Sequence, residues 1–184
     1  MQLASLALVA SLAAGPADSL TAVEWRSDLH QLVAELERWH PNLYHWVSKA
    51  AFDSAVAALD ARIPALTGEQ IVVELARLVA SIGDGHTYFA PTQPSSGVKF
   101  GSYPVAYQRF SEELYVQATD SAGAALLGGR VTRIGRLTAD QALAAVAPLV
   151  SQENAMWVRR WSPWGKCSAG KSSSVIGSSQ RVAT

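Results

Sequence analysis

The chain has 184 residues, of which 49% are hydrophobic and 16% are charged, and its 15 lysines and arginines balance its 15 aspartates and glutamates. This composition predicts a soluble globular protein with a core and excludes a disordered chain. The zero net charge and the lack of a basic stripe argue against nucleic acid or anionic lipid as a partner. Because Cys167 is the only cysteine, an internal disulfide and a closed cysteine zinc site are excluded.

Residues 1–18 have the features of an export signal. The apolar run from Leu3 to Ala14 is too short to cross a bilayer, which takes roughly 20 residues, and small residues follow it as a cleavage site requires. No lysine or arginine precedes the run, so the alternative is an irregular N-terminal segment that is not a signal, or a misplaced start codon. We favour a cleavable signal peptide, and therefore a secreted or periplasmic protein without a membrane span.

Residues 19–87 are predicted to form a helical lobe of three amphipathic helices. Each helix begins at a residue whose side chain can accept a hydrogen bond from the first turn, and these caps are Thr21, Ser48 and Thr67. Apolar residues repeat behind each cap at helical spacing, and prolines at 41 and 64 end the first two helices. The third stripe ends at Ile82, so Gly83 is expected at its left-handed C-terminus.

Residues 98–164 are predicted to form a small mixed β/α lobe. Strand-like runs at 103–110 and 114–119 flank a short hairpin connection, and 128–135 suggests a third strand. Thr138 then caps a helix that carries Leu143, Val146 and Val150. The fold class is therefore α+β, with a second lobe whose order of elements resembles a PDZ-like fold.

The last segment, residues 165–184, is rich in serine, glycine and lysine and is predicted to be a disordered tail. It contains a formal P-loop match from Gly165 to Ser172. A working P-loop needs a buried strand before it and a helix after it, and neither pattern is present. We interpret the match as accidental and expect no nucleotide.

The most suggestive motif is the pentapeptide Gly83, Asp84, Gly85, His86 and Thr87, directly after the third helical stripe. The two glycines permit a sharp turn that could present the imidazole at the edge of the helical lobe. A histidine can take and return a proton near neutral pH. The alternative is a helix terminus with a hydrogen-bonded surface histidine, in which the aspartate makes an Asx-type turn.

The other histidines allow a metal-site hypothesis, which we set aside. His40 and His45 could be combined with Asp84 and His86, but metal hydrolases usually bring two ligands from one rigid element, and no such pair is present. His40 and His45 are expected to cap the first helix and line the surface, and His30 to be solvated. We therefore predict no metal and no cofactor.

A family resemblance adds to these patterns. The motif GDGHT, preceded by WHPNLYHWVSKAAFDSAV and followed by YPVAYQRFSEELYVQATD and LLGGRVTRIG, resembles the N-terminal half of tail-specific (C-terminal-processing) serine peptidases, in particular the tricorn-core-like branch. In tricorn-like relatives a histidine at this turn is the general base for a serine on a later α/β domain. Other relatives use a Ser/Lys pair instead. The resemblance thus implies that His86 is a possible general base, supported by the turn around it.

The sequence departs from that family after Trp164, because the chain continues into the tail and stops at Thr184. We therefore expect the catalytic α/β domain to be missing, through a truncation or frameshift near Gly165, and the chain to be inactive. In the full-length form the partner would be a peptide or protein substrate. Trp157 and Trp161 could seat the missing domain, so self-association through exposed surface is expected. The alternative function is a non-enzymatic module whose β lobe binds peptide termini by strand addition.

Overall fold

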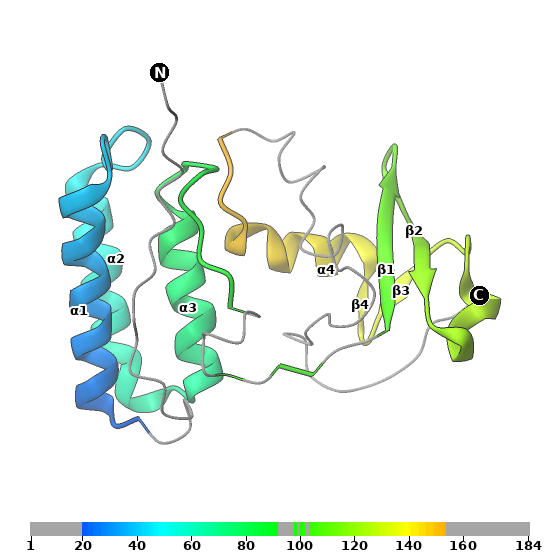
Figure 1. The fold of residues 1–184 in the computed structure, drawn as a ribbon, viewed down its shortest axis with the longest axis horizontal. Coiled ribbons are helices and arrows are strands. Elements are labelled where there is room, and N and C mark those ends of the chain that lie inside the picture. Colours follow the sequence, from blue (N-terminus) through cyan, green and yellow to red (C-terminus); the bar gives the residue numbers. More distant parts are fainter. Residues whose placement is uncertain (1–19, 92–97, 99, 102–103, 154–184) are drawn as a thin grey trace.

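The computed structural model describes residues 20–91, 98, 100–101 and 104–153. Three N-terminal helices are followed by small two-stranded sheets and a short helix, which is an α+β architecture. Figure 1 shows the three helices side by side at one end and the β1–β2 hairpin at the other, with α4 between them. We call residues 20–91 the helical lobe and residues 104–153 the β/α lobe.

The helical lobe contains α1 (Ala22–Trp39), α2 (Lys49–Arg62), the short 3-10 helix η2 (Ile63–Ala65) and α3 (Gly68–Ala80). All three predicted caps are confirmed. The hydroxyl groups of Thr21, Ser48 and Thr67 accept backbone N–H groups in the first turns at 3.3, 3.2 and 3.4 Å. Such caps satisfy amide donors that the start of a helix leaves without a partner. The helices therefore begin where their own side chains can reach the backbone.

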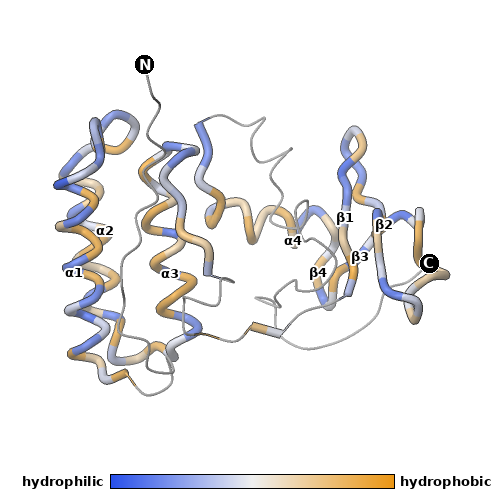
Figure 2. Tube along the Cα trace, viewed as in Figure 1, coloured by the Kyte–Doolittle hydropathy of each residue, from blue (hydrophilic) through white to orange (hydrophobic). Residues whose placement is uncertain are grey.

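The core of this lobe lies between the three helices, and Leu29 and Phe52 are fully enclosed in it. Seven residues of α3 are buried, namely Ile71, Val72, Leu75, Ala76, Leu78, Val79 and Ala80. Figure 2 shows that hydrophobic residues predominate along this helix. It packs against α2 on one side and against the second lobe, through the 3-10 helix η5 (Ala147–Leu149), on another. A helix with a wide apolar face can pack against neighbours on more than one side, and α3 does so, while Gln70, Glu74 and Arg77 form a polar stripe along it.

The β/α lobe begins with the antiparallel strands β1 (Val105–Phe110) and β2 (Glu113–Thr119). The predicted hairpin is confirmed, with Ser111 at a positive φ of 52° in its turn. A 3-10 helix, η4 (Ser121–Leu126), follows and begins at Asp120, whose carboxylate accepts the N–H of Gly123 at 3.0 Å.

The third strand suggested over 128–135 is confirmed only in part, because the segment does not form one continuous strand. Arg130 lies opposite Tyr115 in an isolated bridge to β2, whereas β3 (Arg133–Ile134) pairs with β4 (Leu137–Thr138) in a separate sheet. Gly135 has a φ of +60° and allows the tight reversal between β3 and β4. The segment is therefore shared between two partners instead of extending one sheet.

The last described helix is α4 (Ala139–Val146), which begins at the predicted cap Thr138. Val150 was expected on its apolar face but lies beyond its end, because Pro148 falls in the 3-10 helix η5 that closes the element. The core of this lobe is smaller than that of the helical lobe, and its buried members are Tyr107, Leu114, Val116, Val131 and Val146.

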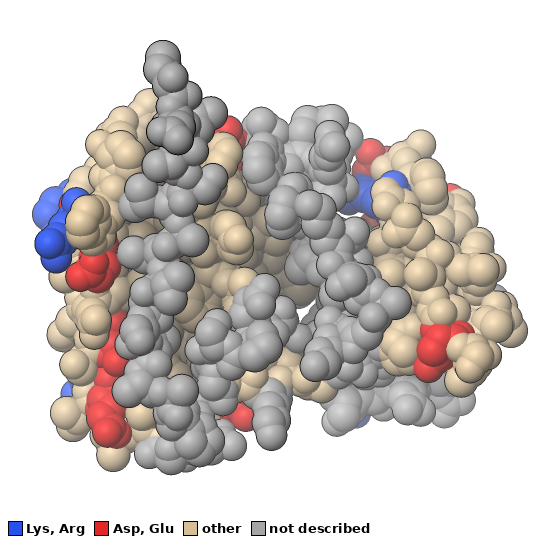
Figure 3. All heavy atoms as spheres, viewed as in Figure 1, with Lys and Arg blue, Asp and Glu red and all other residues tan. Residues whose placement is uncertain are grey.

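The described surface carries scattered charge. On the face drawn in Figure 3, acidic and basic side chains stand singly or in small mixed groups. Among the described helices, none is both long enough and apolar enough to cross a membrane. The predicted signal peptide (1–18), the tail (165–184) with its P-loop match, and the tryptophans at 157, 161 and 164 lie outside the described residues.

Candidate functional site

The predicted turn lies where α3 ends, and Gly83 makes it possible. This residue has a φ of +80°, a conformation that side-chain-bearing residues resist. It also sits against Trp46, because a Cβ atom added to it would come within 2.9 Å of the tryptophan Cβ. A glycine is thus required here for two reasons, backbone conformation and close packing.

Asp84 holds the turn together through both of its carboxylate oxygens. Oδ1 accepts the backbone N–H of His86 at 2.9 Å, which is the Asx-type turn that the sequence indicated. Oδ2 accepts the hydroxyl of Thr87 at 2.7 Å and lies 3.0 Å from Nε2 of His40. Burial alone would raise the pKa of the carboxyl, but these hydrogen bonds outweigh burial and hold the pKa of Asp84 below its ordinary value. The group therefore stays ionised.

His40 connects the end of α1 to this turn, and its tautomer follows from its contacts. Nδ1 accepts the backbone N–H of Asn42 at 3.1 Å, so the ring proton of the neutral imidazole is on Nε2, where it is donated to Asp84. The side chain is only 11% exposed. His40 is the C-terminal cap of α1, as predicted. Since both nitrogens are engaged, this histidine orients the aspartate and is poorly suited to carry protons.

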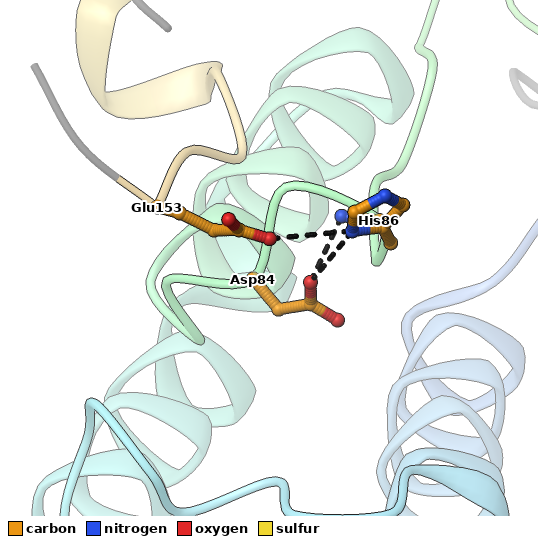
Figure 4. A group of neighbouring side chains, drawn as sticks. All are labelled: Asp84, His86 and Glu153. Atoms are coloured by element: carbon orange, nitrogen blue, oxygen red, sulfur yellow. Dashed lines mark hydrogen bonds and ion pairs between the residues drawn. The ribbon is translucent and has the colours of Figure 1, made fainter. Parts of the chain in front are cut away.

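His86 has the opposite environment. Its side chain is 81% exposed at the edge of the helical lobe, in line with the position expected from the sequence. Nδ1 lies 3.2 Å from Oε1 of Glu153 and 3.6 Å from Oδ1 of Asp84. Figure 4 shows the ring with its other nitrogen turned away from both carboxylates. A carboxylate at Nδ1 is the arrangement that orients an imidazole for proton transfer at Nε2.

Glu153 is a site residue that the sequence did not indicate. It follows η5 and approaches the turn from the β/α lobe, 67 residues further along the chain than His86. The approach depends on η5, which packs against α3. No local pattern marks this glutamate, because its role arises only from how the two lobes pack.

Two exposed aromatic side chains lie near the turn: Tyr88 follows it in the sequence, and Trp46 packs against Gly83. Trp46, which packs at its base against Gly83, remains 65% exposed, and Tyr88 is 68% exposed. The ring of His45 stands edge-on to Trp46 with centroids 4.6 Å apart. Exposed aromatic side chains of this kind are often used to contact partners. His45 is exposed and lines the surface, as expected, and it is not one of the residues that cluster around His86.

The remaining histidine and a shallow cavity lie away from the turn. His30 is 65% exposed on α1, as predicted, and Nε2 lies 3.2 Å from Oδ1 of Asp60. A cavity of about 290 Å³ lies between the starts of α1 and α3, at Trp25, Thr67 and Ile71. The turn follows the end of α3, so this cavity belongs to the opposite end of the helical lobe.

No protein-family model matches the chain, and no curated protein matches it either.

Proposed function

We propose that this chain forms the N-terminal part of a secreted or periplasmic serine-type peptidase of the tail-specific, tricorn-like kind, with His86 as its general base. One observation carries the proposal. Nδ1 of an exposed imidazole lies 3.2 Å from the Glu153 carboxylate, and the other ring nitrogen points away from the Glu153 and Asp84 carboxylates (Figure 4). In such enzymes the nitrogen away from the carboxylate takes the proton of the nucleophile, while the carboxylate orients the ring through Nδ1.

The surrounding residues divide the work that this chemistry needs. Glu153 orients the ring of His86, and Asp84 fixes the backbone from which that ring projects. His40 in turn fixes Asp84 from the end of α1. A catalytic ring must be held in one orientation, because small displacements reduce the rate strongly. In this proposal Asp84 and His40 would fix the turn, and Glu153 would set the orientation of the ring from the β/α lobe.

The serine nucleophile belongs, in this proposal, to an α/β domain outside the described residues. The substrate is a peptide or an unstructured protein segment, and Trp46 and Tyr88 offer apolar contacts beside the base. The oxyanion donors would come from the same domain as the nucleophile, because the two act on one carbonyl group. No metal or cofactor takes part in this reaction.

A second candidate function is a non-enzymatic peptide-binding module. The observation in its favour is that β1 is an edge strand, since among the described residues β2 is its only sheet partner. An edge strand can accept an extended peptide through main-chain hydrogen bonds, as PDZ domains do. A PDZ-like β/α lobe would bind peptide termini there, and the helical lobe would only support it.

The test joins the chain to the nucleophile domain of a tail-specific peptidase and measures hydrolysis of an unstructured peptide. We expect fluorophosphonate labelling of the serine, and a fall in kcat of about 10²–10⁴-fold in His86→Ala with little change in KM, which is the usual contribution of a general base. The matched control is His30→Ala, which removes another exposed histidine beside an acidic residue. Its kcat should equal that of the parent.

Hydrolysis that survives His86→Ala within twofold would overturn the assignment of the base. The peptide-binding alternative predicts a different result, which can be measured on the chain alone. Fluorescence anisotropy would then show binding of a peptide with a free C-terminus, weaker binding of the amidated peptide, and no effect of His86→Ala on either.

A further inference from the structure

Three potential metal ligands meet at the turn and come from two lobes. They are Asp84, His86 and Glu153, whose nearest donor atoms all lie within 4.8 Å of one another (Figure 4). The imidazole Nδ1 is 3.2 Å from the glutamate oxygen and 3.6 Å from the aspartate oxygen. Two ligand atoms of a tetrahedral zinc ion lie about 3.3–3.4 Å apart, given bonds of about 2.0–2.1 Å. Two of the three spacings are therefore already close to those of a metal site.

The charge of the cluster also favours a cation. Two carboxylates face one imidazole, so the group keeps a negative charge even when the ring is protonated. Among the ion pairs between described residues, neither Asp84 nor Glu153 has a lysine or arginine partner. Other acidic residues of the chain do have one, such as Glu37 and Asp53 with Lys49. A divalent ion bound here would add positive charge beside the two carboxylates.

The outer contacts of the cluster resemble those that position metal ligands. Oδ2 of Asp84 is held by the Thr87 hydroxyl and the His40 ring, and Oδ1, which accepts the backbone N–H of His86, lies on the side of the imidazole. Carboxylate ligands in metal sites are usually fixed in this way by hydrogen bonds to their second oxygen. Glu153 is 40% exposed and can rotate to shorten the longest spacing. One ligand is thus preset and another is adjustable.

We propose that Asp84, His86 and Glu153 bind a divalent transition-metal ion, for which Zn²⁺ is the ion to test. Imidazole favours zinc over magnesium or calcium, and two carboxylates with one imidazole leave a fourth position for water. The inference does not rest on the proposed peptidase activity. If the peptidase proposal is also correct, the bound ion takes the place of the direct contact between Glu153 and Nδ1 that orients the base. Zn²⁺ should then inhibit hydrolysis.

The test is titration of the purified full chain with Zn²⁺, followed by calorimetry, and with Co²⁺, followed by its visible absorption. We expect one saturable site with four-coordinate Co²⁺ bands. The variants His86→Ala and Glu153→Gln should each weaken Zn²⁺ binding by at least tenfold, and both residues are exposed enough for the fold to tolerate the change. His40→Asn should weaken it about 10–100-fold through the outer contact.

Two matched controls keep the result specific. His30→Ala removes a histidine that also lies 3.2 Å from a carboxylate oxygen, and Cys167→Ser removes the only thiol; both should bind Zn²⁺ as the parent does. The absence of saturable binding would overturn the proposal, and so would binding unchanged in His86→Ala and Glu153→Gln. Because the readout is binding and not hydrolysis, these outcomes are independent of the fate of the peptidase proposal.

Discussion

The helical lobe and the β/α lobe are stabilised in different ways. In the helical lobe, long helices with side-chain caps enclose one continuous core around Phe52 and Leu29. In the β/α lobe, strands as short as two residues surround a core of few buried side chains. The candidate site lies where the two lobes meet, with the turn on the helical lobe and Glu153 on the other. The difference indicates that the helical lobe holds the turn with His86 firmly, whereas Glu153 on the β/α lobe can adjust its position more easily.

The largest expected effect tests this difference directly. Phe52→Ala should lower the free energy of unfolding by about 3–5 kcal/mol, because the fully enclosed ring leaves a cavity between helices. Leu114→Ala in the β/α lobe should cost about 2 kcal/mol, at the low end for such substitutions, because the small core of this lobe can collapse more readily around the shorter side chain. Urea denaturation measures both values.

Amide hydrogen exchange shows which elements each of the two substitutions destabilises. Phe52→Ala should speed exchange in α1, α2 and α3, whereas Leu114→Ala should speed it mainly in β1 and β2. Equal acceleration in both lobes for both variants would mean that they unfold as one cooperative unit, and the comparison would then fail.

A glycine pair separates backbone conformation from packing. Gly83 in the helical lobe and Gly128 in the β/α lobe have φ angles of +80° and +76°, but a Cβ at the first meets Trp46 and a Cβ at the second meets nothing within 4 Å. Gly128→Ala should therefore cost about 1–2 kcal/mol, from the left-handed conformation alone. Gly83→Ala should cost more, because the tryptophan must also shift. Thermal unfolding of the two variants side by side measures the difference.

The contribution of packing has its own control. In the double variant Gly83→Ala, Trp46→Gly, the tryptophan Cβ that the added methyl group would meet is gone, so the penalty relative to Trp46→Gly should fall to that of Gly128→Ala. If Gly83→Ala and Gly128→Ala cost the same in the parent chain, Trp46 does not restrict the turn.

The smallest expected effect concerns Asp28 of α1, a carboxylate that destabilises the helical lobe near neutral pH. Partial burial, together with the charge of Glu24 one turn earlier, raises the pKa of Asp28 above its ordinary value. A carboxyl with a raised folded pKa stabilises the fold fully below its unfolded pKa, about 3.9, and loses that contribution as pH rises through the folded pKa. Asp28→Asn should therefore be more stable than the parent near pH 7, and the gain should disappear toward pH 3.

Urea denaturation at several pH values measures this gain, and Glu24→Gln provides the matched variant. It removes the neighbouring charge while glutamine can still accept the Thr21 N–H of the capping box. Glu24 also titrates, with a pKa lowered by its hydrogen bonds to Thr21, so the quantity to compare is the gain from Asp28→Asn in the two backgrounds. In the Glu24→Gln background that gain near pH 7 should shrink without disappearing, because burial is the larger cause of the raised pKa of Asp28. A parent chain no less stable than Asp28→Asn at pH 7 contradicts the prediction.

The limits of sequence reasoning are clear at two places. Residues 128–135 alternate like a strand, yet pairing is decided by which edges are within reach, and the segment divides between β2 and β4. His40 was recognised as a helix cap, but its hydrogen bond to Asp84 joins residues 44 positions apart and leaves no local pattern. The sequence thus predicted the turn that carries His86, but it did not predict the contacts of His40 and Glu153 with that turn.

The sequence by itself determined what depends on neighbours within a turn or two of the chain. The caps Thr21, Ser48 and Thr67, the left-handed Gly83 and the Asx turn of Asp84 all act over a few residues, so residue types and spacing were sufficient to predict them. The tertiary structure alone decided that His40 meets Asp84 and that Glu153 meets His86. These contacts exist because helices bring distant segments together to bury apolar surface, and the polar side chains at the junction are carried along with them.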